Sequence, residues 1–258
     1  MVYVGVRGWV LMAVLSLMIP GGLGVGRSDA GNIAPPPSPS SSDPVLNEAT
    51  LAQIIRYFKT EYQKKQDNGK GVQFAAAINI AGRYCTAFDN NFLDGEDSAK
   101  VKEAINNGVK LYTGEKLVAA RPQFFKRLPS IHSERRLLMC VDNNTFVTPM
   151  QNLLNNNQHG CVVFYTYNSP CLELCLNQTE GVQSCILDSL SMLTNHRGLK
   201  AFVFSQVYRN DIGEEKRDKL AAGLRLVAKQ VPLYKCSDDS CVKCLSGNQI
   251  VPQCLSNT

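Results

Sequence analysis

The stretch CVVFYTYNSPCLELC, residues 161–175, decides how this chain is expected to fold. Its first seven residues are rich in β-branched and aromatic side chains, which predicts a buried strand. A turn of helix is expected to begin at Pro170, because proline fits the first helical turn, where no N–H is needed. Cys171 and Cys175 follow within that turn. The sequence therefore poses one main question, which is whether these cysteines are disulfide halves or metal ligands.

Upstream, the segment SIHSERR at residues 130–136 places His132 and Glu134 at the start of a predicted helix. Zinc takes four tetrahedral ligands, and a catalytic zinc site supplies three from protein and leaves one position for water. Cys171 and Cys175 are four residues apart, so they share one face of a regular helix, whose N-terminus favours thiolates. With His132 they make three ligands, and Glu134 is free to carry a proton.

The remaining elements are predicted from hydrophobic periodicity and capping residues. Helices are expected at 46–62, 94–107, 130–140, from 148, 182–193 and 214–229, and strands at 72–80, 116–120, 161–167 and 201–208. Helices that alternate with apolar strands indicate an α/β fold, with helices covering a largely buried sheet in three layers. In such folds, ligand sites form beyond the carboxyl ends of the strands.

The N-terminal region is not expected to belong to this fold. An apolar run of eleven residues at 9–19 is too short to span a bilayer and is followed by a Pro-Gly-Gly break and small residues, which predicts a signal peptide at 1–26. An uncleaved anchor is the alternative. A Pro/Ser-rich linker is expected at 27–45, a domain at 46–235 and a cysteine-rich tail at 236–258. The mature protein is expected to be secreted, with no membrane span.

His-x-Glu followed by Pro-Cys-x-x-Cys is the signature of the zinc-dependent nucleoside and nucleic-acid deaminases. The chain resembles their AID/APOBEC branch over about 72–229, through VVFYTYNSPC at 162–171 and AFVFSQVYRNDIGEEKRDKLAAGLRLV at 201–227. The resemblance implies a five-stranded mixed sheet flanked by helices. It also implies hydrolysis of a cyclic amidine C–N bond, most often converting cytosine to uracil. His132, Cys171 and Cys175 would bind Zn²⁺, and Glu134 would be the acid and base.

The sequence departs from that family at several positions. Three residues separate the two cysteines instead of two, and Asn168 stands where a tryptophan is usual. Tyr167 or Tyr208 could instead stack on a base, although Tyr167 could equally belong to the strand core. Arg121 and Phe124 open a basic, aromatic segment that either holds a phosphate and a base or forms a solvated loop. A nucleoside or single-stranded nucleic acid is the expected substrate.

Ten cysteines in a secreted chain suggest disulfides. In the tail, disulfides among Cys236, Cys241, Cys244 and Cys254 are favoured over a four-cysteine zinc knuckle. Cys85 and Cys185 are further disulfide candidates, while Cys140 and Cys161 are considered as buried free thiols. The pairing cannot be deduced from the sequence. Asn143 and Asn177 begin glycosylation sequons.

Net charge is +5, with 27 basic and 22 acidic residues, which is too mild to predict nucleic-acid binding by itself and is compatible with an anionic ligand. Three functional hypotheses remain open. The first is a secreted zinc-dependent deaminase. The second is an inactive deaminase fold that serves as an extracellular binding module with structural zinc, and the third is a metal-free, disulfide-rich secreted protein. No protein partner is predictable from the sequence.

Overall fold

The computed structural model describes residues 46–107, 109–126, 130–139, 147–179 and 183–257. The predicted signal peptide and linker lie outside these residues, as do Cys140 and Asn143. Across the described ranges, no helix combines the length and apolar character needed to cross a membrane.

The core of the fold is a mixed sheet of seven strands in the order β2-β3-β1-β4-β5-β6-β7. The strands are β2 (Leu111–Thr113), β3 (Leu117–Ala120), β1 (Ala75–Ile80), β4 (Cys161–Asn168), β5 (Lys200–Gln206), β6 (Leu233–Cys236) and β7 (Cys241–Lys243). β4, β5 and β6 run parallel, and the other neighbours are antiparallel. The predicted α/β class is confirmed, but the sheet is wider than the five strands implied by the resemblance. The short β2 and the β6–β7 hairpin lack the long apolar runs that made the other strands recognisable.

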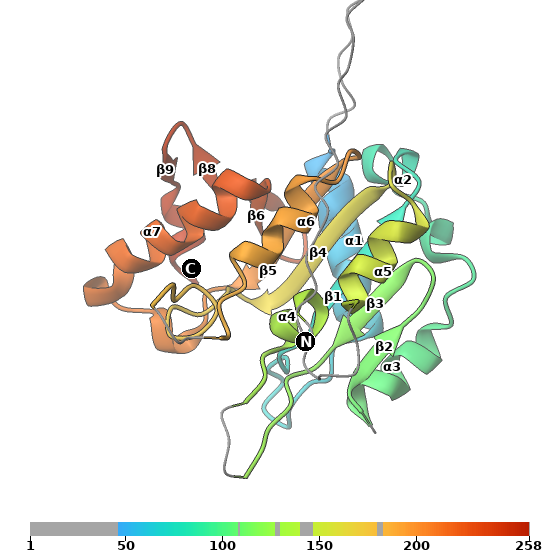
Figure 1. Cartoon of the computed structure of the whole chain (residues 1–258), viewed down its shortest axis with the longest axis horizontal. Coiled ribbons are helices and arrows are strands. Elements are labelled where there is room, and N and C mark those ends of the chain that lie inside the picture. Colours follow the sequence, from blue (N-terminus) through green and yellow to red (C-terminus); the bar gives the residue numbers. More distant parts are fainter. Residues whose placement is uncertain (1–45, 108, 127–129, 140–146, 180–182, 258) are drawn as a thin grey trace, which may run out of the picture. The chain divides into compact units, whose positions relative to one another are not determined.

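Helices cover both faces of this sheet and make the three layers that the sequence predicts (Figure 1). One face carries α1 (Glu48–Glu61), α2 (Arg83–Thr86) and α3 (Ser98–Asn106), and the other carries α4 (Ser133–Leu138), α5 (Pro149–Asn156), α6 (Ser191–Thr194) and α7 (Glu214–Gln230). Short 3-10 turns are η1 (Asn90–Leu93), η2 (Asp188–Leu190), η3 (Arg209–Asp211) and η4 (Pro252–Leu255), and a small hairpin pairs β8 (Leu245–Ser246) with β9 (Gln249–Ile250). All six residues of β1 are buried, because successive side chains enter opposite cores.

Two predicted helices are wrong or shortened. The segment after Pro170 is a turn closed by a hydrogen bond from Leu176 N to Cys171 O at 3.0 Å, which is one residue longer than an α-helical step. The helix expected at 182–193 is reduced to η2 and α6, and its first residue lies outside the described ranges.

Three disulfides connect the periphery of the fold. Cys85 bonds Cys161, so the expectation that Cys161 is a free thiol is wrong. The reason is topological, because α2 follows directly after β1, whose last residue pairs with Cys161 in β4. The bonds Cys236–Cys241 and Cys244–Cys254 confirm disulfides in the tail and leave no cysteine set there for zinc. Cys185, expected in a disulfide, is a free thiol.

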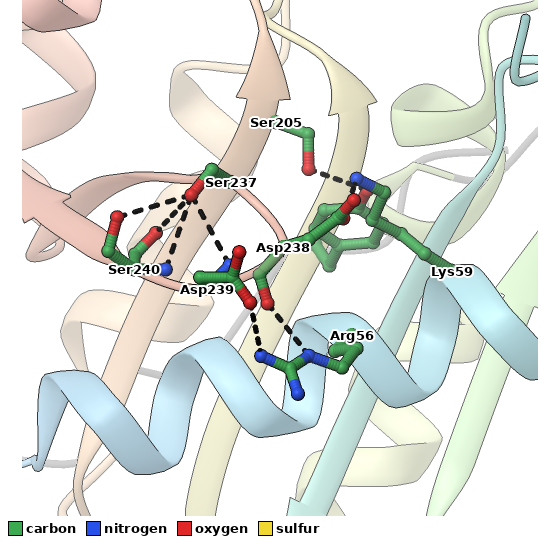
Figure 2. A network of polar contacts seen from close by, with 8 residues as sticks. Arg56, Lys59, Ser205, Ser237, Asp238, Asp239 and Ser240 are labelled. Carbon is green, nitrogen blue, oxygen red and sulfur yellow. Dashed lines mark hydrogen bonds and ion pairs between the residues drawn. The ribbon is translucent and has the colours of Figure 1, made fainter.

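The hairpin that follows β6 is fastened to α1 (Figure 2). Arg56 donates to Asp239 Oδ1 at 2.6 Å and to the Asp238 carbonyl at 2.8 Å, while Lys59 forms an ion pair with Asp238. These contacts are largely exposed, so each contributes at most about 1 kcal/mol. The cysteine-rich tail is therefore ordered by strand pairing, disulfides and contacts with the first helix.

The Cys85–Cys161 bond joins residues 76 apart, and constraining an unfolded chain over such a loop is worth about 4 kcal/mol. The double substitution Cys85→Ala/Cys161→Ala is expected to lower the free energy of unfolding by about that amount, measured by chemical denaturation. Cys185→Ala is the control, because its thiol forms no disulfide, and it should change stability far less. Equal stability of the double variant and the parent would contradict this assignment.

Candidate metal centre

The candidate site forms where the carboxyl end of β4 meets the beginning of α4. β4 ends at Asn168, and the chain turns through Ser169 and Pro170 to Cys171. His132 is the N-cap residue of α4, and its side chain does not cap the helix. The imidazole is therefore free to point toward the sulfur atoms. Within the described residues, His132, Cys171 and Cys175 are the group able to offer three ligand atoms to one metal ion.

The three ligand atoms form a compact triangle. His132 Nδ1 lies 3.3 Å from Cys175 Sγ and 3.6 Å from Cys171 Sγ, and the two sulfur atoms are 3.6 Å apart. Tetrahedral bonds of about 2.0 Å to nitrogen and 2.3 Å to sulfur would separate the ligand atoms by roughly 3.5 to 3.8 Å. The residues thus fit zinc closely. The sulfur separation is also much longer than a disulfide bond, which is about 2.05 Å.

The pKa shifts of the three ligand residues show which proton a metal ion would displace. Contact with Cys175 and then with His132 lowers the pKa of Cys171 well below its usual range. The same contact, together with burial, raises the pKa of Cys175. The pKa of His132 is raised, chiefly by its hydrogen bond with Cys171. One thiolate therefore forms readily, whereas the second thiol loses its proton only when a metal takes the proton's place.

The turn that carries both cysteines is held by hydrogen bonds rather than by a regular helix. Asp211 Oδ2 accepts from Leu172 N at 3.0 Å, and Cys175 O accepts from Ile186 N at 2.9 Å. Burial raises the pKa of Asp211. This irregular turn accommodates three residues between the cysteines and still brings both sulfur atoms to His132. The expected helix N-terminus does not supply the environment of Cys171.

Glu134 is only 2% exposed and its carboxyl group is fully hydrogen-bonded. Thr166 Oγ1 donates to Oε1 at 2.7 Å, and Ser133 Oγ donates to Oε2 at 3.0 Å. Gln73 Nε2 lies 3.2 Å from Oε1, and Gln73 Oε1 accepts from Asn168 N at 2.8 Å. Burial raises the pKa of Glu134. The carboxyl group is thus fixed beside the triangle and favours its protonated form.

Gln73 and Thr166 were missed in the sequence, although one signal existed. Gln73 is a polar residue at the start of the otherwise largely apolar segment VQFAAAINI, and the strand there begins only at Ala75. Thr166 looks like an ordinary β-branched strand residue, and no sequence pattern shows that its hydroxyl faces Glu134.

A cavity of about 160 Å³ leads to the triangle and to Glu134. Its wall combines amides, hydroxyls and two aromatic rings: Gln73, Pro122, Phe124, Ser130, His132, Glu134, Asn168, Ser169, Cys171 and Tyr208. Phe124 is 72% exposed and stands at the rim, as a residue that contacts a ligand would. Tyr208 is held by a hydrogen bond from its N–H to Ser169 Oγ. The structure therefore brings these two sequence-selected residues to the site.

Two other sequence-selected residues lie elsewhere. Tyr167 packs against the core on the α1 side of the sheet and lines a separate cavity. Arg121 is buried and directs its guanidinium to Asn106 Oδ1 and Gln73 O, in a neighbouring cavity. Asn177 is half-buried and hydrogen-bonds the Glu173 carbonyl, so its glycosylation stays a prediction.

Replacing Glu134 should reveal the cost of its burial. Because its folded pKa lies above the ordinary 4.5, the folded parent keeps a proton that the unfolded chain releases. The contribution of Glu134 to parent stability is therefore greatest below pH 4.5 and falls as pH rises through the folded pKa, by up to about 1.4 kcal/mol per pH unit. In metal-free protein, Glu134→Gln should become more stable than the parent as pH increases. Denaturation from acid to neutral pH measures this gap, and a gap that does not change with pH contradicts it.

Comparison with known proteins supports this arrangement. The family model described as Secreted Novel AID/APOBEC-like Deaminase 1 matches residues 48–258. No curated protein and no solved structure matched the chain. The match covers the sheet, the candidate metal centre and the disulfide-bonded tail, and the expected secretion agrees with the family's description. The chain therefore belongs to the family of secreted AID/APOBEC-like deaminases.

Proposed function

We propose that this protein is a zinc-dependent hydrolytic deaminase that acts on cytosine-type bases in nucleosides or single-stranded nucleic acid. One observation carries the proposal: the triangle of His132, Cys171 and Cys175 lies beside a buried, fully hydrogen-bonded Glu134 in the wall of a small cavity. A structural zinc site usually has four protein ligands, whereas three ligands leave one position for chemistry.

The proposed chemistry replaces an exocyclic amine with oxygen, so water is consumed and ammonia released. His132, Cys171 and Cys175 would hold zinc, which supplies a Lewis acid and activates water. Glu134 would move protons at its Oε atoms: it would protonate the ring nitrogen, take a proton from the attacking water, and pass that proton to the leaving amine. Its raised pKa suits this role, because a general acid must keep its proton to a higher pH than an ordinary carboxyl group does.

Thr166, Ser133 and Gln73 would position the Glu134 carboxyl group rather than react. Their hydrogen bonds fix both Oε atoms, so the carboxyl group needs little reorganisation during proton transfer. The cavity is smaller than the typical ligand pocket of 300–1,000 Å³, which favours one flat ring over a large ligand. Phe124 and Tyr208 provide aromatic rings against which a base could lie.

Glu134→Gln tests the proposed proton transfer. The variant should keep zinc, because Glu134 is not a proposed ligand, while deamination of cytidine and single-stranded DNA falls by about 10² or more. Zinc content and product formation are measured on the same preparations. The exposed Glu215→Gln is the matched control, since it makes the same carboxyl-to-amide change at a residue that does not line the cavity. Turnover by Glu134→Gln at the parent rate would refute the role of Glu134. Zinc-loaded parent without activity on any nucleoside or strand would instead support an extracellular binding module.

The proposed ligation predicts a change in thiol reactivity. With zinc bound, Cys171 and Cys175 should resist alkylation in the folded protein. Chelation should make Cys171 reactive, because its pKa is lowered, while Cys175, whose pKa is raised, should react more slowly. Cys185 is the internal reference, because it is a half-buried free thiol outside the triangle. Mass spectrometry of alkylated peptides identifies each site. Protection of both cysteines that survives chelation, or their recovery as a disulfide in the secreted protein, would argue against zinc ligation. His132→Ala should lower zinc content, because the substitution removes one of the three ligands and leaves only the two thiolates.

A further inference from the structure

We propose that a second cavity, lined by Lys64, Lys65, Lys110 and Arg121, binds a phosphate group. We call it the basic cavity. The segment that precedes β1 separates it from the candidate metal centre, because Val72 lines the basic cavity and Gln73 lines the other one. The proposal stands independently of deamination, because it concerns binding alone.

The basic cavity has a volume of about 520 Å³ and a strongly unbalanced charge. It is lined by Lys64, Lys65, Gln66, Asp67, Val72, Asn106, Lys110 and Arg121. Four of these side chains are cationic and one, Asp67, is a carboxylate, so the lining carries three more positive than negative charges. A concave surface with charges of one sign concentrates its field and attracts an anion.

Arg121 gives the cavity a fixed cation at its base. Arg121 is only 5% exposed. Its guanidinium donates to three neutral oxygens: Asn106 Oδ1 at 2.7 Å, Gln73 O at 3.3 Å and Tyr62 O at 3.5 Å. No carboxylate pairs with it in the part of the chain that the structure describes. A guanidinium has five N–H donors, so two have no hydrogen-bond partner among the described residues and remain for an anion.

A buried charge without an opposite charge is costly, and an arriving phosphate would reduce that cost. Burial also lowers the pKa of Arg121 to about 10, as expected where no carboxylate offsets the loss of water. Guanidinium groups bind phosphate through two parallel hydrogen bonds. Arg121 therefore supplies a rigid, desolvated contact, and the lysines supply flexible ones.

The backbone around the basic cavity is already organised. Val72 N donates to Lys64 O at 2.8 Å, and Lys65 is bridged to Gly71, so the loop after α1 folds back on itself. Lys110 O accepts from Arg121 N at 3.0 Å and from Arg136 Nη1 at 2.7 Å. The buried Arg136 thus holds the opposite wall and adds a further positive charge behind it. Little ordering of the backbone would be needed on binding.

The basic cavity and the cavity beside the candidate metal centre are lined by residues that are adjacent in the chain. Val72 lines the first, and Gln73 lines the second. Gln73 also connects them chemically, because its carbonyl accepts from Arg121 and its side-chain amide contacts Glu134. A nucleotide could place its base in one cavity and a phosphate in the other. The same chemistry would also bind a free polyphosphate.

Calorimetry with inorganic pyrophosphate at low salt tests the site directly. The parent should bind, and Lys64→Gln/Lys65→Gln should weaken binding at least about tenfold, because two charge-assisted contacts are lost. Lys219→Gln/Lys229→Gln is the matched control, since it removes two exposed lysines from α7 and should bind as the parent does. No binding by the parent, or equal weakening in both double variants, would overturn the proposal. The substitution Arg121→Gln is added only if its circular dichroism matches the parent.

A competition experiment separates the two sources of phosphate. A short oligothymidylate contains no cytosine, so it reports binding without turnover. If it binds and pyrophosphate displaces it, and Lys64→Gln/Lys65→Gln weakens it, the site serves nucleic-acid phosphates. If pyrophosphate binding depends on these lysines and oligothymidylate binding does not, the site serves a free polyphosphate. Both results support the phosphate site. Glu134→Gln should bind pyrophosphate like the parent, so failure of the proposed deamination would leave this site standing.

Discussion

Two buried thiols and a half-buried imidazole within 3.6 Å of one another form the constraint on which the functional end of this fold depends. Without a cation, the group has to share protons, which depresses the pKa of Cys171 and raises that of Cys175. The protein tolerates this because the surrounding framework is rigid. β4 and α4 deliver the ligands from elements anchored in the central sheet, and Asp211 fixes the intervening turn. A site held in this way before metal arrives needs little reorganisation to bind it.

The cysteines that the structure describes fall into separate groups. Six of them form disulfides that connect α2 to β4 and close the hairpins of the tail, and none of these six lines the cavity beside Glu134. Cys171 and Cys175 are buried, and their sulfur atoms face His132 instead of each other at bonding distance. This separation accounts for how a secreted chain can form disulfides and still keep two thiols for a metal. The disulfide partners are set by strand pairing and hairpin closure, whereas the end of β4 places the two thiols of the candidate metal centre.

The sequence predicted the parts that depend on local pattern. The apolar runs at Ala75–Ile80, Cys161–Asn168 and Lys200–Gln206 identified the central strands. The motif pointed to His132, Glu134, Cys171 and Cys175, which lie together at the candidate metal centre. It did not predict what depends on tertiary contact. Cys161 looked like a core thiol until strand pairing placed it beside Cys85, and Tyr167 alternates away from the metal cavity to the other face of the sheet. Gln73 and Thr166 matter because both hydrogen-bond Glu134 Oε1, which no spacing reveals.

X-ray absorption at the zinc edge of the secreted protein tests the central claim most directly, because it counts the atoms that bind the metal. The account predicts one zinc ion per chain with two sulfur ligands, one imidazole nitrogen and one lighter atom, at about 2.3 Å for sulfur and 2.0 Å for nitrogen. Four sulfur ligands would place the metal among other cysteines. The account would be contradicted if the protein is refolded in the presence of zinc and is then folded and disulfide-bonded but holds no zinc.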